Sequence, residues 1–150
     1  MFDFIRIACA VPEVEVGNTE FNTQEIIKYI DINKDADIVV FPELCVTGYT
    51  CADLFFQRTL IDGAKAGISE IAKATEGTNS VVAVGAPVII GGQLYNCAVL
   101  MSNGRVDGIS VKTFIPTYNE YYEKRWFSSA ADLKCTSICS DELGLDGEYE

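Results

Sequence analysis

The sequence predicts an α/β protein in which helices pack on a sheet. Short apolar runs typical of buried strands alternate with longer segments whose apolar residues recur at helical spacing. Three further extended segments then follow one another, separated by glycine-containing dipeptides. The chain has 150 residues, of which 49% are hydrophobic, so it is long enough to bury one core.

The first half of the chain holds two predicted strands, residues 4–10 and 37–41. Asn22 or Thr23 can cap a helix between them. Its buried side would carry Ile26, Ile27, Tyr29 and Ile30. A second helix is expected between residues 58 and 75. Its apolar face would carry Leu60, Ile61, Ala64, Ile68, Ile71 and Ala72.

The second half is predicted to be mostly extended. Gly77 is placed to end the second helix. The dipeptides Gly91-Gly92 and Asn103-Gly104 suit tight hairpin turns that need positive φ. The strands that these turns would join are residues 80–90, 93–102 and 105–113. We therefore predict a domain over residues 1–130 and a poorly defined tail over residues 131–150.

A glutamate directly follows the second predicted strand, in the segment Phe41-Pro42-Glu43-Leu44. Because proline cannot continue a sheet ladder, Pro42 ends the strand and fixes the direction in which Glu43 leaves it. Open α/β sheets carry their sites at the carboxyl ends of strands. Glu43, with Tyr49 nearby in the sequence, is therefore a candidate general base. The alternative is a strand-end turn with a solvated acid.

A lysine ends another apolar strand. Lys112 is followed by a proline turn at Pro116 and then by an aromatic-rich segment that reaches Phe127. A lone lysine at a strand end is usually a surface cation. The aromatic residues and two glutamates that follow this lysine indicate a site instead.

Composition excludes several classes of protein. The formal net charge of −11 argues against nucleic acid and against an anionic membrane surface as partners. No apolar run approaches the length of a membrane span, and residues 1–6 lack the pattern of a secretory signal. Cys9, Cys45 and Cys97 lie in apolar strand-like contexts, so we interpret them as buried thiols in a reducing, cytoplasmic compartment.

A metal site is not predicted. Cys135 and Cys139 have a spacing that can contribute two ligands, but the chain contains no histidine and no matching second cysteine pair.

The glutamate and lysine motifs together resemble the nitrilase, or carbon–nitrogen hydrolase, superfamily. The motifs are Phe-Pro-Glu-x4-Gly-Tyr at residues 41–49 and Lys-x3-Pro-x-Tyr-x-Glu at residues 112–120. Residues 112–127 are most similar to the glutaminase domain at the N-terminus of glutamine-dependent NAD synthetases. The resemblance covers about residues 3 to 130. It implies part of an α-β-β-α sandwich with mixed sheets.

The resemblance also implies roles for four residues. Glu43 would be the general base, and Lys112 would stabilise the oxyanion. Tyr118 would contact the substrate L-glutamine, and Glu120 would be the second glutamate, which orients Lys112. Other roles remain open. Lys112 could be a surface charge, and Tyr118 could be an ordinary core residue. Glu120 could form an ion pair with Lys124 or with Arg125.

The family's nucleophile is a cysteine in a motif resembling Glu-Ile-Cys-Glu-Asp. Residues 137–141, Ser-Ile-Cys-Ser-Asp, are superficially similar, but Cys139 lies only 27 residues after Lys112. The preceding segment is a poor buried strand, and two glycines follow. We therefore expect the nucleophile to be missing and the isolated chain to be a truncated, inactive part of the enzyme.

The resemblance implies a synthetase domain outside this chain, with ATP and Mg²⁺ as its cofactors, and it implies no cofactor for these residues. Self-association into a homo-oligomer is expected, because a partial sandwich would expose sheet edges and one apolar face. Two other functions remain open: a stand-alone amidase or nitrilase, and a non-catalytic interaction module.

Overall fold

The computed structural model describes residues 4–134, 137–139 and 148–149, and it confirms the α/β class. Five strands form one sheet in the order β1-β2-β3-β4-β5. Their bounds are β1 Ile7–Cys9, β2 Ile38–Val40, β3 Val81–Ile90, β4 Gln93–Ser102 and β5 Arg105–Val111. The first three strands run parallel to one another, and β4 and β5 add two antiparallel hairpins. A separate antiparallel pair joins β6 (Ile138–Cys139) to β7 (Glu148–Tyr149).

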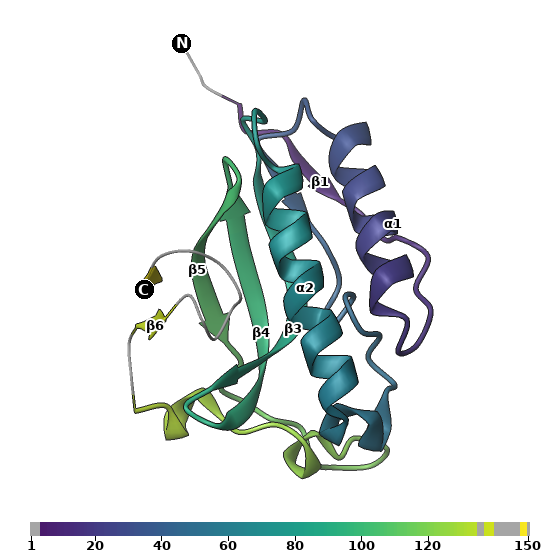
Figure 1. Ribbon diagram of the computed structural model, residues 1–150, viewed down its shortest axis with the longest axis vertical. Coiled ribbons are helices and arrows are strands. Elements are labelled where there is room, and N and C mark those ends of the chain that lie inside the picture. The colour runs from purple at the N-terminus through teal and green to yellow at the C-terminus, as the bar shows by residue number, and fades with distance from the viewer. Residues whose placement is uncertain (1–3, 135–136, 140–147, 150) are drawn as a thin grey trace.

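Two helices, α1 (Thr19–Ile32) and α2 (Arg58–Ala74), lie side by side over the same face of the sheet (Figure 1). The core between helices and sheet is formed by alternate residues of the strands and one stripe of each helix. Its most buried side chains include Ile26, Ile30, Ile68, Ile71, Val39, Val82, Val84 and Val99. The spacing of apolar residues therefore predicted both buried helix faces.

The start of α1 differs from the prediction. Asn18 is the N-cap, and its side chain accepts a hydrogen bond from Phe21 N. Asn22 and Thr23 lie inside the helix and are almost fully buried. The Asn22 carboxamide instead donates to the carbonyl oxygens of Glu15 and Val46, 2.8 and 3.1 Å away. Asn22, which was predicted to cap the helix, therefore makes a tertiary contact instead, because the loop after β2 packs against this helix.

The other elements follow the sequence more closely. β3 and β4 differ from their predicted ranges by at most one residue at each end, whereas β1 and β2 are shorter than predicted, with three paired residues each. Both hairpin dipeptides have positive φ, with 58° and 82° at Gly91 and Gly92 and 48° and 81° at Asn103 and Gly104. Three 3-10 helices were not predicted: η1 (Ala52–Phe56), η2 (Glu123–Arg125) and η3 (Ala130–Asp132).

The face of the sheet opposite the helices is more open. Val40 and Val81 are 38% and 37% exposed there, although each neighbours a fully buried valine in the same strand. The loop after β2 crosses the end of this face and packs directly on Gly85 of β3. A Cβ atom at Gly85 would overlap the main chain of Pro42 and Leu44 and would lie 2.7 Å from the Glu43 Cα atom.

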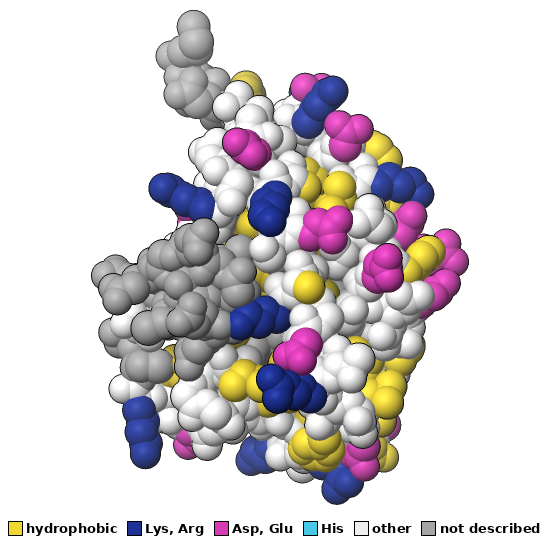
Figure 2. Space-filling view, viewed as in Figure 1, with side chains coloured by type: hydrophobic (Ala, Val, Ile, Leu, Met, Phe, Trp, Pro, Cys, Tyr) yellow, Lys and Arg dark blue, Asp and Glu magenta, His cyan; other side chains and the backbone are white. Residues whose placement is uncertain are grey.

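The helical side of the molecule carries charges of both signs, with hydrophobic side chains scattered between them (Figure 2). In the part of the chain that the structure describes, no helix combines the length and apolar character needed to cross a membrane. Cys45, Cys51 and Cys97 are buried, but Cys9 is exposed, which corrects the prediction that Cys9 is a buried thiol. Cys9 is exposed because its side chain lies on the open face of the sheet beside Val40, whereas its neighbour Ala8 packs against the core.

We predict that Gly85→Ala destabilises the fold by about 1–3 kcal/mol, because the added methyl group must displace main-chain atoms of the Glu43 loop. Urea unfolding measures the change. The matched control is Gly63→Ala, whose methyl group would meet only the side chain of Thr19. An equal decrease in the free energy of unfolding for the two variants would contradict tight packing of the loop on β3.

Candidate active site

The sheet topology brings Glu43 and Lys112 together from distant parts of the sequence. Glu43 follows β2, and Lys112 follows β5. These two strand ends reach the same end of the sheet, because β2 and β3 are parallel and β4 and β5 complete an antiparallel meander. Lys112 Nζ donates to Glu43 Oε1 over 2.6 Å. Leu44 then turns the chain sharply with a φ of 51°, a left-handed value that is uncommon outside glycine.

A second carboxylate completes an ion network around the lysine. Lys112 Nζ is 3.0 Å from both carboxylate oxygens of Glu123, the first residue of η2. The Glu123 side chain is only 4% exposed, compared with 28% for Lys112 and 45% for Glu43. Burial of a carboxylate without a partner has a large unfavourable free energy. The ion pair with Lys112 offsets this free energy for Glu123, so the two residues stabilise each other's position.

Two neutral donors support the carboxylates. The Asn96 carboxamide of β4 donates to Glu43 Oε1 at 2.5 Å and to Glu123 Oε2 at 3.4 Å. The Tyr49 hydroxyl donates to Glu123 Oε1 at 2.7 Å. Glu43, Glu123 and the ammonium group therefore lie in a shell of hydrogen bonds, and Lys112 carries the one positive charge that the described residues contribute to it.

The network shifts the ionisation of two of its members. Burial alone would lower the pKa of Lys112, but the hydrogen bonds that Lys112 donates to Glu43 and Glu123 outweigh it and hold the pKa above its ordinary value. Burial, together with the hydrogen bond to Glu123, raises the pKa of the Tyr49 hydroxyl far above its usual range. At neutral pH the lysine is therefore a fixed cation and Tyr49 a hydrogen-bond donor.

Glu120, the predicted partner of Lys112, is exposed and lies in a turn before η2. In the described part of the chain, the lysine is paired with Glu43 and Glu123, so the structure does not bring Glu120 into this network. Both glutamates follow the lysine within a short segment. The sequence carries no local signal that distinguishes them, because the choice depends on which one the turn directs inward.

Tyr118, the predicted substrate contact, is 64% exposed and packs edge-on against Tyr121, with ring centroids 5.7 Å apart. It is therefore not part of the core. Tyr118 lines a hollow of about 490 Å³ together with Lys112, Phe114, Lys124 and others. A second hollow of about 340 Å³ lies on the open sheet face, where Glu43 and Lys112 form one wall over small residues of β3 and β4. The network therefore contributes to the walls of both hollows.

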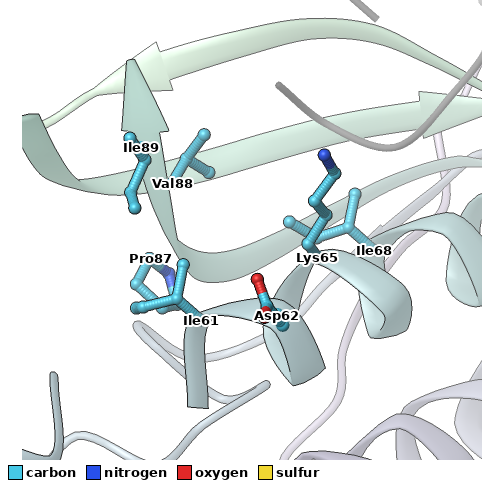
Figure 3. A pocket seen from close by; sticks show the side chains of 7 residues that line it. All are labelled: Ile61, Asp62, Lys65, Ile68, Pro87, Val88 and Ile89. Atoms are coloured by element: carbon cyan, nitrogen blue, oxygen red, sulfur yellow. The ribbon is translucent and has the colours of Figure 1, made fainter. Parts of the chain in front are cut away.

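A further hollow of about 220 Å³ lies between α2 and β3 (Figure 3). Ile61, Ile68 and Val88 are among the side chains that line it, together with Asp62 and Lys65. Its lining shares no residue with the two hollows beside Lys112.

The segment that carries Glu123 is anchored on both sides. Asp53 of η1 accepts hydrogen bonds from Arg125 Nε and Nη2 at 2.6 and 2.8 Å and from Trp126 Nε1 at 3.0 Å. These donors hold the pKa of Asp53 well below its usual range. Phe127 packs edge-on against Phe55, with centroids 4.9 Å apart. Arg125 thus pairs with Asp53 and is not the partner of Glu120.

The buried cysteines are poor nucleophile candidates. Burial raises the pKa of Cys45 to about 11 and that of Cys97 to about 12, and it also raises the pKa of Cys51. A thiol with such a pKa holds its proton near neutrality, whereas the thiolate is the reactive form. Cys139 belongs to β6, but its side chain lies outside what the structure describes.

The arrangement is suited to proton transfer beside a developing negative charge. Oε1 of Glu43 accepts from both Lys112 and Asn96, whereas its Oε2 has no hydrogen-bond partner in the described residues. Glu43 also lines the hollow on the open face. One oxygen is therefore held in place while the other is available to accept a proton, and the ammonium group can stabilise a nearby oxyanion.

A mixed α/β sheet with a carboxylate and a lysine at its strand ends defines a hydrolase fold of the nitrilase type. The carbon–nitrogen hydrolase family model matches residues 6–145, and the chain belongs to this family. A glutamine-dependent NAD(+) synthetase of Xanthomonas campestris is 36% identical over 131 residues. That alignment covers 85% of this chain and 23% of the relative. The Aquifex aeolicus enzyme of the same name is 34% identical over 95% of this chain and 27% of its own length.

Solved structures agree with this assignment. The crystal structure of a glutamine-dependent NAD(+) synthetase from Cytophaga hutchinsonii matches with a TM-score of 0.86 at 33% identity, covering 97% of this chain and 24% of that one. An amidase of the nitrilase superfamily from Nesterenkonia matches with a TM-score of 0.70 at 20% identity, over 84% of this chain and 48% of that one. This second match supports the fold alone. The chain spans only about a quarter of the synthetases that it resembles.

The network predicts a loss of stability at alkaline pH. The pKa values of Lys112 and Tyr49 are raised above 10.5 and 10.0 by folding, so their contributions are complete below those values and disappear as the pH rises through the folded-state values. We expect the free energy of unfolding in urea to stay constant up to about pH 10 and to fall as the pH rises further. Lys112→Met and Tyr49→Phe should each reduce this fall.

The matched control is Lys124→Met, which removes an exposed lysine from the same segment and should keep the wild-type dependence on pH. If Lys112→Met also kept that dependence, the buried ion network would not contribute to stability as described.

Proposed function

We propose that this chain supplies part of the glutaminase site of a glutamine-dependent NAD synthetase. The observation that carries the proposal is the Glu43–Lys112 pair, 2.6 Å apart at the end of the sheet. Support comes from the relatives named glutamine-dependent NAD(+) synthetase, which match most of the chain at more than 30% identity. L-Glutamine would be the substrate of this site.

In the proposed reaction, Glu43 accepts the proton of a cysteine thiol through its Oε2 oxygen, which has no hydrogen-bond partner among residues 4–134. The thiolate attacks the side-chain amide carbon of glutamine, and Lys112 stabilises the oxyanion that forms. The carbon–nitrogen bond breaks and ammonia leaves with a proton returned by Glu43. Water then hydrolyses the thioester to glutamate and restores the thiol. Tyr118 would contact the glutamine from the neighbouring hollow.

The cysteine in this scheme is proposed to be missing from the 150-residue chain, because burial raises the pKa of the Cys45 and Cys97 thiols and Cys139 lies only 27 residues after Lys112. We further propose that the 150-residue chain alone does not hydrolyse glutamine. A synthetase domain that uses ATP and Mg²⁺ would consume the ammonia in the complete enzyme, to amidate nicotinic acid adenine dinucleotide.

A chimaera tests the proposal. The corresponding segment of the Xanthomonas campestris synthetase is replaced by residues 6–130 of this chain, and glutamate release from glutamine is measured. We expect the chimaera to hydrolyse glutamine in preference to simple amides. Glu43→Gln in the chimaera should reduce the rate by about 10²–10⁴-fold, as loss of a general base does.

The parent synthetase is the control for the assay, and Glu120→Gln is the matched control for Glu43→Gln, because Glu120 lies outside the ion network. A folded chimaera that prefers simple amides would favour the amidase alternative. Near-normal glutamine hydrolysis by the Glu43→Gln chimaera would show that Glu43 is not the base.

A further inference from the structure

Asn96 is a buried polar residue in an otherwise apolar part of β4. It is 3% exposed, and its neighbours Tyr95 and Cys97 point to the core on the helical side. Side chains alternate across a strand, so Asn96 faces the opposite side, toward Glu43 and Lys112. Burial of a carboxamide is costly unless its hydrogen-bonding groups find partners. The contacts of Asn96 therefore explain why a polar side chain is placed here.

Asn96 contacts all three charged residues of the network. Its Nδ2 group has two hydrogens, and they point to two different carboxylates, those of Glu43 and Glu123. Its main-chain oxygen accepts from the Lys112 N–H at 2.9 Å. Since carboxylate oxygens only accept, the amide nitrogen and not the amide oxygen must face them.

Among the three charged residues, Glu43 is the one whose side chain is least restrained by burial, so a hydrogen bond from Asn96 has the largest effect on its position. Its side chain is 45% exposed, whereas that of Glu123 is almost fully buried. Lys112 reaches Glu43 through a long, flexible side chain, but Asn96 is short and fixed in the middle of a paired strand. Both groups bond the same oxygen, Oε1. Together they hold Oε1 in place, while the Glu43 side chain lines the hollow on the open sheet face.

We propose that Asn96 is a positioning residue that holds the Glu43 carboxylate against Lys112 and directs its second oxygen toward the reaction site. The importance of this for catalysis rests on the proposed role of Glu43 as the base. The positioning itself is a property of the 150-residue chain, so it can be measured in the absence of glutamine or turnover.

Asn96→Leu tests the proposal, because leucine has the same branched arrangement of side-chain heavy atoms but donates no hydrogen bond. Without its anchor, Glu43 should leave Lys112, which then loses one of its two carboxylate partners. The free-amine fraction of Lys112 should rise, and its acetylation by acetic anhydride should become about three- to tenfold faster. Peptide mass spectrometry measures the rate, with Lys28 as an internal reference because it forms an ion pair with Glu25 of its own helix, away from the network.

Two controls separate positioning from general loosening of the fold. Asn22→Leu removes another buried asparagine, which bonds main-chain groups of Glu15 and Val46, and should leave Lys112 labelling unchanged. In a Glu43→Gln background, Asn96→Leu should add little further labelling, because the two residues act on the lysine through the same contact. Unchanged labelling in Asn96→Leu, or equal increases in Asn22→Leu and Asn96→Leu, would overturn the proposal.

A measurement on the chain without a substitution at Asn96 covers the case in which Asn96→Leu does not fold. The side-chain amide protons of Asn96 should exchange slowly with solvent in NMR spectra, and Glu43→Ala should accelerate their exchange. Rapid exchange in the wild-type chain would contradict the proposal. Loss of glutamine hydrolysis in the chimaera would instead bear on the proposed function, so the two failures remain distinguishable.

Discussion

The ammonium group of Lys112, held between the carboxylates of Glu43 and Glu123, is the interaction on which the site depends. It joins the loop after β2 to a segment that is distant in the sequence, which runs from the end of β5 to the 3-10 helix η2. Glu123 is almost fully buried, so the Lys112 cation beside it stabilises the position in which η2 packs. The charge network is therefore part of the fold as well as of the proposed chemistry.

The sheet provides the geometry that this network needs. Gly85 lets the loop after β2 pack directly against β3, which places Glu43 above the open face and not beyond its edge. The antiparallel pairing of β4 with β5 fixes the main chain of Lys112 beside Asn96. Asp53 and Arg125 hold the segment around Glu123 from the outer side. Each charged group is thus positioned by rigid elements on more than one side, as preorganised electrostatic stabilisation requires.

Sequence analysis predicted the parts of this arrangement that depend on local patterns. Glu43 and Lys112 were found because each follows an apolar strand, and the helices were found from the spacing of residues such as Ile68 and Ile71. The same analysis predicted Glu120 as the second partner of Lys112, whereas the structure places Glu123 there, and it did not predict the contact of Asn96 with Glu43. Both errors concern the direction of a side chain that is decided by long-range contacts. Asn22 is a similar case, since its bond to Val46 spans 24 positions and overrides its local preference for a helix cap.

The most direct test of the central claim is an NMR titration of the Lys112 side-chain nitrogen in the 150-residue chain. Two carboxylates within hydrogen-bonding distance should hold the pKa of Lys112 above its ordinary value of 10.5, and Glu123→Gln should lower it. A pKa at or below the ordinary value in the wild-type chain would show that burial dominates over the two carboxylates. The lysine would then not be the cation around which this site is built.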